Sequence, residues 1–290
     1  MVTINDPAVF DAVAAHVFGP NADVAELRCS DLARVTRLNV TGARSLAGLE
    51  YAVNLSQLAI RNSSVSSLAP VEGLARLTTL NVTGSSLTTL HSLPALPALV
   101  ALDISTNFVS DLTPLADVPG LTYLKANGNA ITDISGLADL RELTWVDLSE
   151  NQITDITPLA GHEQLETLLL NDNFISDAGP LSTATRLQRL GLANNALTDV
   201  DFNRDLELRT VALSGNHITY VRGVAQNRTS MAAGAWTSAA TAATSRPTTR
   251  SRRTCWPSAV ACAWSHSVKT ACWRCRAGKA GKLTAPGAPH

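Results

Sequence analysis

Leu102-Asp-Ile104-Ser-Thr-Asn107-Phe-Val109 is the first of five consecutive copies of one pattern. The later copies are Leu124-Lys-Ala126-Asn-Gly-Asn129-Ala-Ile131, Val146-Asp-Leu148-Ser-Glu-Asn151-Gln-Ile153, Leu168-Leu-Leu170-Asn-Asp-Asn173-Phe-Ile175 and Leu190-Gly-Leu192-Ala-Asn-Asn195-Ala-Leu197. Each copy starts 22 residues after the one before it. A fixed period of this length, with leucines and one asparagine at set places, is typical of leucine-rich repeats.

The same register continues on both sides of this stretch, to Leu38, Leu58 and Leu80 upstream and to Val211 downstream. In each unit two apolar residues alternate on a short strand, and further apolar residues follow in the returning arc. We therefore predict an α/β solenoid, namely a leucine-rich repeat right-handed superhelix with a concave parallel β-sheet. A small N-terminal helical cap and a disordered C-terminal tail complete the predicted fold.

Residues 1–36 are predicted to form the N-terminal cap, and residues 37–225 the repeat domain of about nine units. Asp6 can accept the free amides at the start of a helix, and Pro7 suits the first helical position. Gly19-Pro20 would end that helix. A helix here would cover the apolar end of the solenoid, which would otherwise expose core leucines.

An asparagine recurs five positions after most strand starts, and we predict that it forms a structural ladder. Buried amide side chains can satisfy backbone groups where each strand turns away. The ladder comprises Asn107, Asn129, Asn151, Asn173, Asn195 and Asn216. Ala43, Ser63 and Ser85 hold this position in the first three units, where we expect looser turns.

Prolines recur twelve positions after several strand starts, and Ser or Thr followed by Asp recurs eight and nine positions after most of them. We predict that these residues fix turns on the convex side, where a short helical or 3₁₀ segment begins. The prolines are Pro70, Pro114, Pro158 and Pro180.

Residues 226–290 break the pattern and differ sharply in charge. Residues 1–226 hold all 24 Asp+Glu and 13 of the 23 Lys+Arg, so their net charge is −11, whereas the remaining 10 Lys+Arg follow Asn227. With little aliphatic content, the tail cannot bury enough surface to offset its ordering entropy. Two explanations stay open: a shift of reading frame near residue 228, or a genuine disordered basic tail.

The ends of the repeat units carry a resemblance to a known family. Ser110-Asp111-Leu-Thr-Pro114-Leu, Thr132-Asp133-Ile-Ser-Gly-Leu137 and Thr154-Asp155-Ile-Thr-Pro158-Leu resemble the units of the internalins, bacterial proteins with 22-residue leucine-rich repeats. The likeness covers roughly residues 1 to 225. It implies a helical N-terminal cap, and adhesion or host-protein recognition, as in some relatives.

Three residues of each unit should face solvent on the concave side: those one before, one after and three after the strand start. Near the middle this face holds two adjacent aromatics with charged neighbours, a composition typical of protein-interface hot spots. The predicted partner-binding residues are Tyr123, Trp145, Lys125, Asp103, Asp147, Arg189 and Asn127. The alternative is that Tyr123 and Trp145 are ordinary scattered surface aromatics.

No catalytic constellation appears, and we predict no enzyme activity, no cofactor and no metal site. Cys255, Cys262, His266, Cys272 and Cys275 have atypical spacing for zinc. An acidic solenoid is a poor partner for nucleic acid, and no apolar run is long enough to cross a membrane. As written the chain has no signal peptide, which places it in the cytoplasm, or at the surface or secreted if the N-terminus is incomplete.

The function predicted from the sequence is non-catalytic binding of a partner protein through the concave face, by a monomer. Two alternatives remain open. One is a regulatory or scaffolding subunit of an intracellular enzyme, and the other is a truncated, non-functional product.

Overall fold

The structure is a computed structural model that describes residues 2–21, 23–93, 96–202, 206, 208–222 and 230–231. All of these residues lie in one unit, Met1–Ala243. The tail predicted at 226–290 therefore lies outside the described residues, except for Ser230 and Met231.

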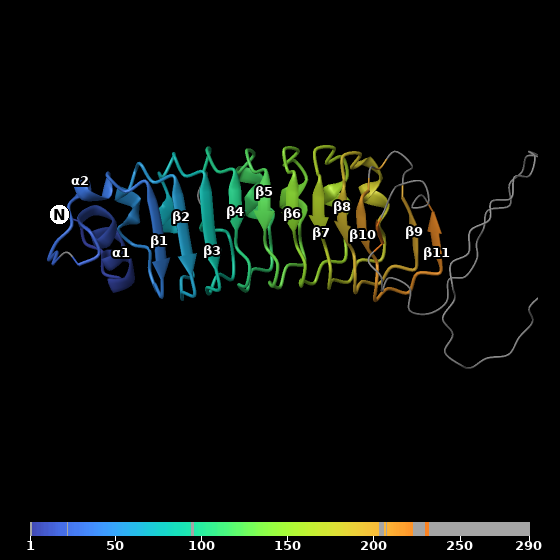
Figure 1. Ribbon diagram of the computed structural model, residues 1–290, viewed down its shortest axis with the longest axis horizontal. Helices are drawn as coiled ribbons and strands as arrows, with labels where there is room; N and C mark the ends of the chain where they lie inside the picture. The colour runs from blue at the N-terminus through green and yellow to red at the C-terminus, as the bar shows by residue number, and fades with distance from the viewer. Residues whose placement is uncertain are drawn as a thin grey trace, which may run out of the picture. The chain divides into compact units, whose positions relative to one another are not determined.

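Ten short strands form one parallel sheet whose order follows the chain, with β9 and β11 left out of it (Figure 1). Each repeat unit adds the next strand, because the inward leucine at each strand start aligns with its counterpart in the next unit. The strands are β1 (Arg37–Thr41), β2 (Gln57–Arg61), β3 (Thr79–Thr83), β4 (Ala101–Asp103), β5 (Tyr123–Lys125), β6 (Trp145–Asp147), β7 (Thr167–Leu169), β8 (Arg189–Gly191), β10 (Thr210–Ala212) and β12 (Ser230–Met231). The predicted parallel sheet is confirmed.

Strand β12 lies beyond the expected end of the repeats, because Ser230 and Met231 pair with Thr210 and Val211 of β10 in the register of the other strands. A second, two-stranded parallel sheet joins β9 (Asp199–Asp201) to β11 (Tyr220–Arg222) in the returning arcs of the last units.

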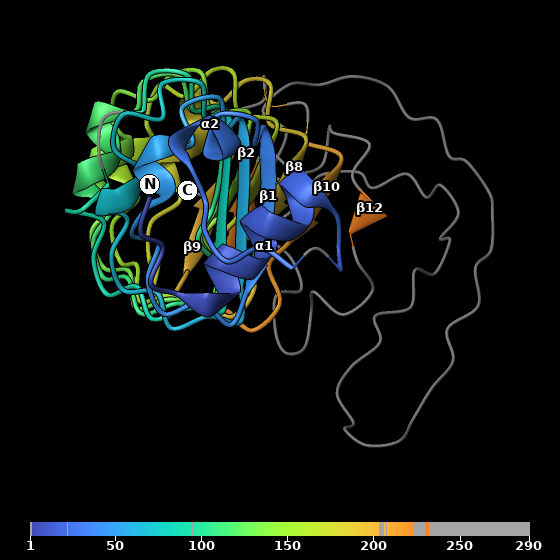
Figure 2. The same ribbon diagram turned by 90° about the vertical axis from the view of Figure 1, so that its left-hand side faces the viewer.

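Short 3₁₀ helices occupy the returning arcs, on the side opposite the strands (Figure 2). They are η1 (Leu49–Tyr51), η2 (Ala69–Val71), η3 (Thr113–Asp117), η4 (Ser135–Leu137), η5 (Thr157–Leu159) and η6 (Gly179–Thr183). Pro114 stands in the first turn of η3, and the Asp111 carboxylate accepts the Thr113 N–H at 2.6 Å. This geometry confirms the predicted turn, because the aspartate fixes the bend and proline has no N–H to satisfy.

Two helices cover the first end of the core, α1 (Pro7–Phe18) and α2 (Cys29–Leu32) (Figure 2). Asp6 caps α1 by accepting the N–H groups of Ala8 and Val9 at 3.0 and 3.3 Å. Val9 and Val13 turn inward and are fully buried. The predicted N-terminal helical cap is therefore present, and its apolar face joins the core of the first repeat.

One continuous hydrophobic cluster runs from the cap through the repeats. In a unit such as that of Leu102, the strand contributes Leu102 and Ile104, and the arc contributes Val109, Leu112 and Leu115, all of them fully buried. Burying such a side chain is worth roughly 1.5–3 kcal/mol. Because each unit packs mainly on its two neighbours, stability accumulates along the array.

The fourth residue after the first inward residue of each strand, such as Leu38 or Leu58, has a positive φ. This feature was not predicted from the sequence. Left-handed backbone lets the chain leave the strand and enter the arc, and glycine adopts it without strain. The residues are Gly42, Asn62, Gly84, Thr106, Gly128, Glu150, Asp172, Asn194 and Gly215. Thr106 and Glu150, each at φ 57°, are the unfavourable residue types in this row.

Candidate binding face

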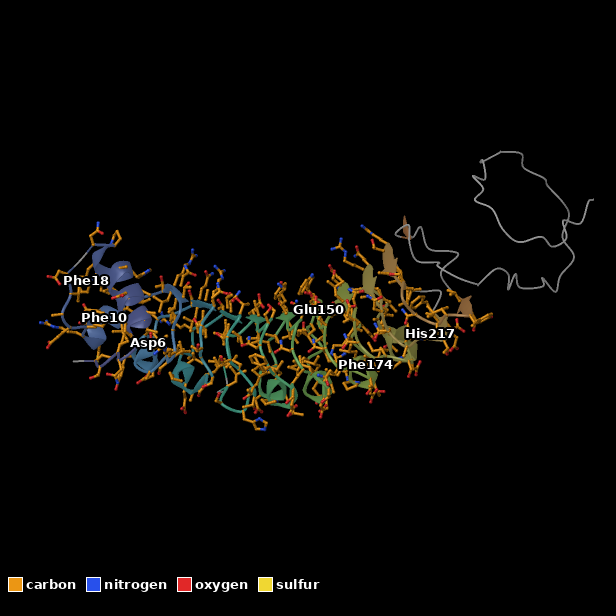
Figure 3. The ribbon with its side chains drawn as sticks, turned by 90° about the horizontal axis from the view of Figure 1, so that it is seen from below. Asp6, Phe10, Phe18, Glu150, Phe174 and His217 are labelled. Carbon is orange, nitrogen blue, oxygen red and sulfur yellow. The ribbon has the colours of Figure 1, made fainter. Side chains whose placement is uncertain are left out.

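The parallel register arranges the outward-facing side chains of the sheet into rows that run across the strands. The residue just before the first inward apolar residue of each strand belongs to one such row. Figure 3 shows that the strands line the inner side of the curved array. From β1 to β8 the row reads Arg37, Gln57, Thr79, Ala101, Tyr123, Trp145, Thr167 and Arg189. We call these outward-facing side chains of β1 to β8 the sheet face.

Tyr123 of β5 and Trp145 of β6 stack on one another in the middle of this row. Their ring centroids are 4.3 Å apart, and their planes differ by 8°. Stacking leaves both residues half-buried rather than fully exposed. The contact fixes two large rings at adjacent strand positions, and such aromatic pairs contribute about 0.5–1.5 kcal/mol beyond their buried area.

Small side chains flank the stacked pair. Ala101 of β4 pairs with Tyr123, and Thr167 of β7 pairs with Trp145. Neither flank of the pair is therefore filled by a third large side chain from the same row. The stacked rings are therefore the two largest side chains among these four neighbours in the row.

Charged residues form the next row of the sheet face, beside the aromatic pair. Lys125 of β5 stands between Asp103 of β4 and Asp147 of β6 in the strand register. Each carboxylate also has a local role, since Asp103 accepts the Ser105 N–H and Asp147 the Ser149 N–H, both at 3.0 Å. These bonds hold the carboxylates close to the sheet.

The environment of the aromatic pair also changes the chemistry of Tyr123. Burial raises the pKa of the Tyr123 hydroxyl above its usual value, and the nearby carboxylates of Asp103 and Asp147 raise it further. The phenol is therefore neutral at physiological pH and can act as a hydrogen-bond donor or acceptor.

Other predicted partner-binding residues are more dispersed. Arg189 is exposed on β8, two strands from Trp145. Asn127 follows β5 and is half-buried, with its side-chain oxygen enclosed and lacking a hydrogen-bond partner among the described residues. The structure thus brings Tyr123, Trp145 and the charged row together and leaves Arg189 apart from them.

We predicted that the residue three positions after each strand start faces solvent. This prediction is wrong for two residues. Ser105 and Ser149 are 4% and 9% exposed, and the aspartate two residues earlier accepts the backbone N–H of each serine. Gly191 in the neighbouring row is also buried, and the amide of Asn171 lies over it. The accessible face is therefore narrower than the sequence suggests.

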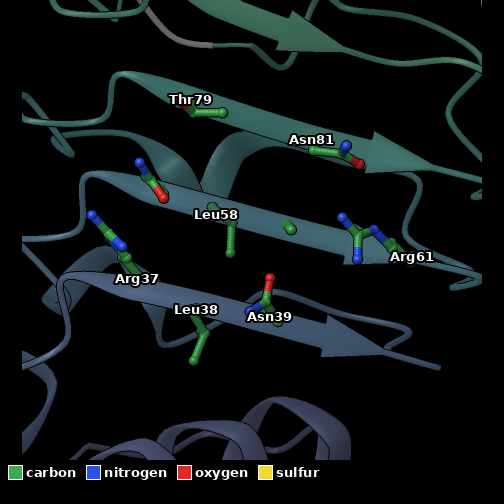
Figure 4. Close-up of a pocket in the computed structure, with 9 residues that line it drawn as sticks. Arg37, Leu38, Asn39, Leu58, Arg61, Thr79 and Asn81 are labelled. Atoms are coloured by element: carbon green, nitrogen blue, oxygen red, sulfur yellow. The ribbon is translucent and has the colours of Figure 1, made fainter.

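A polar hollow of about 340 Å³ opens over β1, β2 and β3, at the end of the sheet face nearest the cap (Figure 4). Arg37 and Arg61 stand at opposite ends of it. Asn39, Gln57 and Asn81 also line it. The sequence pattern puts these residues on the concave side, but only the strand register groups Arg37, at the start of β1, with Arg61, at the end of β2, around one hollow.

The asparagines of the predicted ladder connect successive units through their side chains. The Asn151 amide donates to the backbone oxygens of Ala126 and Leu148 at 3.1 and 3.0 Å, and its oxygen accepts the Ile131 N–H at 3.0 Å. Bonds of the same kind come from Asn107, Asn129, Asn173, Asn195 and Asn216. Together they fix the spacing of the rows on the sheet face.

The first three units differ at this ladder position. The Ser63 hydroxyl accepts the Ala43 N–H at 3.1 Å and donates to the Arg61 carbonyl at 3.0 Å. Ser63 thus keeps part of the asparagine's role. The Ser85 hydroxyl, by contrast, is buried without a hydrogen-bond partner among the described residues.

His162 is the one fully buried histidine of the described residues, and it lies in an arc far from the sheet face. Its Nε2 is 3.0 Å from the Leu137 carbonyl oxygen. Within the described part of the chain, no three His, Cys, Asp or Glu side chains gather as a metal ion requires, and no helix has the length and apolarity to cross a membrane.

Comparison with known proteins places these features in a family context. The family described as Leucine Rich repeats (2 copies) matches residues 119–161 and 163–205. The structure of internalin C2 from Listeria monocytogenes is similar at a TM-score of 0.63 with 28% identity, covering 74% of this chain and 93% of that one. The chain is an internalin-like leucine-rich repeat protein. No curated protein matches its sequence.

Two further solved structures have a similar leucine-rich repeat fold. The functional domain of InlJ from Listeria monocytogenes is 21% identical at a TM-score of 0.53, covering 77% of this chain and 60% of that one. The repeat ectodomain of the plant receptor kinase GASSHO1/SCHENGEN3 from Arabidopsis thaliana is 21% identical at a TM-score of 0.50, covering 62% of this chain and 23% of that one. At this identity the two structures show the fold alone.

Proposed function

We propose that this internalin-like protein binds a partner protein non-catalytically through its sheet face, with the Tyr123–Trp145 pair as the central anchor. The stacked pair is the observation that carries the proposal. Leucine-rich repeats commonly serve as interaction modules, but the choice of partner resides in the exposed residues rather than in the scaffold.

Preorganisation supports the role of the aromatic pair. Two rings that already stack lose little side-chain freedom when a partner packs against them, so more of the contact energy appears as affinity. Trp and Tyr are also enriched among the residues that dominate interface energetics. The charged row of Asp103, Lys125 and Asp147 beside the pair would form the polar rim that such anchors usually have.

A solved structure with a similar fold supports the use of this architecture for binding. The GASSHO1/SCHENGEN3 ectodomain was solved in complex with CASPARIAN STRIP INTEGRITY FACTOR 2. That complex belongs to the plant receptor, and it supports a partner for this chain only through the shared fold.

The test uses the full-length chain as bait in cell lysate and in extracellular fluid, followed by affinity measurement with each purified partner. Trp145→Ala and the double variant Tyr123→Ala/Trp145→Ala are compared with the unaltered protein. We expect the double variant to lose about tenfold to thirtyfold or more in affinity, since truncating an anchor costs about 2 kcal/mol or more.

Tyr51→Ala is the matched control, because Tyr51 is an exposed aromatic on η1, away from the sheet. It should leave the affinity within twofold of the unaltered protein. The proposal would be contradicted by a partner whose affinity is unchanged in the Tyr123→Ala/Trp145→Ala variant, or falls as much in Tyr51→Ala.

A further inference from the structure

We propose that the hollow over β1, β2 and β3 is a carboxylate-binding site for the partner protein, formed around Arg37 and Arg61. This inference rests on the proposed function, because the carboxylate is taken to belong to the partner that packs on the sheet face. It adds a second, electrostatic subsite to the aromatic anchor and defines the partner's chemistry.

Unused hydrogen-bond donors are the first support. The guanidinium groups of Arg37 and Arg61 are exposed and make no hydrogen bond or ion pair within the described residues. Each carries five N–H donors in a planar fork that matches the two oxygens of a carboxylate. Figure 4 shows the two groups at opposite ends of the hollow, so an anion between them meets positive charge on both sides.

The absence of a competing carboxylate in the lining is the second support. The lining contains two arginines and neutral residues, with no Asp or Glu. The nearest acidic position in the strand register is Asp103 of β4, and its oxygens are engaged by Ser105 and, at 3.3 Å, by the Asn81 amide. The repeat region as a whole is acidic, so this hollow is a local reversal of its charge.

Two neutral amides add further hydrogen-bond donors to the hollow. Gln57 lies beside Arg37 in the strand register, and Asn39 lies two positions further along β1. No partner within the described residues uses the amide donors of these two side chains. Charge-assisted bonds to arginine supply affinity, while the amides add donors for the remaining lone pairs. Asp and Glu side chains and the chain terminus are the groups through which a protein partner presents this chemistry.

The distance between the hollow and the aromatic pair defines the partner further. Arg61 of β2 and Arg37 of β1 lie three and four strands from β5, and neighbouring strands are about 4.8 Å apart, so the arginines are roughly 14–19 Å from the aromatic pair. An extended segment advances about 3.3 Å per residue. A partner segment that crosses the strands would therefore place an acidic residue about four to six residues from an apolar or aromatic one.

The test is a titration of the full-length, ¹⁵N-labelled protein, followed through the Nε–H signals of its arginines. The probes are acetyl-tetraglutamyl amide, which has side-chain carboxylates alone, acetyl-tetraserine with a free terminal carboxylate, and inorganic phosphate. We expect the Arg37 and Arg61 signals to shift together and to saturate with at least one carboxylate probe. Whichever of the two saturates identifies the source as side chain or chain terminus.

Substitutions make the titration specific. Arg37→Gln/Arg61→Gln should weaken binding of the carboxylate probe at least tenfold, without changing the unfolding midpoint, because both side chains are exposed. Arg76→Gln is the control, since Arg76 is an exposed arginine between η2 and β3, outside the sheet face. It should change the affinity less than twofold.

Three results would overturn the inference. They are shifts of the Arg76 signal as large as those of Arg37, saturation by phosphate but by neither carboxylate probe, and an unchanged affinity in the double variant. These results are separable from failure of the proposed function. If the arginine signals do not shift but partner capture depends on Trp145, only the carboxylate-binding inference is wrong. If partner capture does not depend on Tyr123 and Trp145, the proposed anchor is wrong, and the titration still tests the hollow independently.

Discussion

The carboxylate of Asp6 accepts the backbone N–H of Arg44 at 2.7 Å, which ties the first helix to the first repeat unit. The same oxygen accepts the Ser45 N–H at 3.0 Å, while the other oxygen caps α1. One side chain thus satisfies backbone groups on both sides of the junction between cap and solenoid. Asp6 is 7% exposed, so these groups have little access to water.

Replacing Asp6 should loosen this junction. In Asp6→Asn the amide group would face N–H donors, so we expect the free energy of unfolding to fall by roughly 2 kcal/mol at pH 7. Chemical denaturation of the two proteins measures this loss. Asp11→Asn, an exposed change within α1, is the control and should stay within about 0.5 kcal/mol of the unaltered protein.

The Asp6 contribution should also depend on pH. Burial acts to raise the pKa of Asp6, but the N–H groups of Arg44, Ser45, Val9 and Ala8 outweigh it and hold the pKa below the ordinary 3.8. A lowered folded-state pKa gives stability that is present above about pH 3.8 and is lost as the pH falls through the folded value. The difference between the protein and Asp6→Asn should therefore shrink in acid, and a constant difference down to pH 2 would contradict this account.

Asn151→Ala should destabilise the middle of the array. The change leaves the Ile131 N–H and the Ala126 and Leu148 carbonyls without their side-chain partner in a region closed to water. Because each buried unsatisfied group costs about 1–3 kcal/mol, we expect a loss of roughly 2 kcal/mol or more. Amide exchange should quicken first at Ile131, and uniform protection across the array would argue against the ladder's role.

Ser85→Asn should have the opposite effect. Ser85 holds the ladder position of its unit, its hydroxyl is unpartnered, and the Val65 N–H that an asparagine would serve has no acceptor among the described residues. Completing the ladder should raise the free energy of unfolding by about 1 kcal/mol. Ser85→Ala is the control and should be nearly neutral. A loss of stability on Ser85→Asn would mean that this turn lacks room for the larger side chain.

Thr106→Gly should stabilise the protein, although glycine normally weakens a fold. Thr106 has φ 57°, where a β-branched side chain is strained by about 1–2 kcal/mol. Glycine removes that strain but loses more entropy on folding, so the expected net gain is about 0.5–1 kcal/mol. Glu150→Gly should gain less, and Asn194→Gly least, since asparagine tolerates this conformation. Urea denaturation of the three variants tests this ranking, and the reverse change Gly128→Thr should destabilise.

His162 should make the protein less stable in mild acid. Burial lowers the pKa of His162, and the nearby charge of Arg141 lowers it further. The unfolded chain therefore binds a proton near pH 6.5 that the folded protein resists, so stability falls as the pH drops below about 6.5 toward the folded value. In His162→Gln the loss of stability between pH 7.5 and pH 5.5 should be smaller. An identical pH profile for both proteins would contradict this prediction.

The elements that could be predicted from the sequence share one physical origin. Inward leucines such as Leu102 and Leu124 recur at a fixed period, and a solenoid repeats one local environment, so each unit's pattern reports its own structure. The 3₁₀ turn at Pro114 and the helix cap at Asp6 were predictable for the same reason, since both depend on neighbours within a few residues.

Other features could not be predicted because they depend on contacts between units. The second pair of bonds from Asp6 reaches residues 38 and 39 positions away. The left-handed row was partly visible, since glycine or asparagine holds most of its positions, but Thr106 and Glu150 obscured the pattern.

The sequence alone determined the repeat, the parallel sheet and the row in which Tyr123 and Trp145 stand, because a 22-residue period puts equivalent residues at equivalent places. Only the tertiary structure decided that the two rings stack and that Arg37 and Arg61 share one hollow. Those relations depend on strand register and side-chain orientation across separate units. Residues about twenty positions apart became neighbours only when the sheet formed.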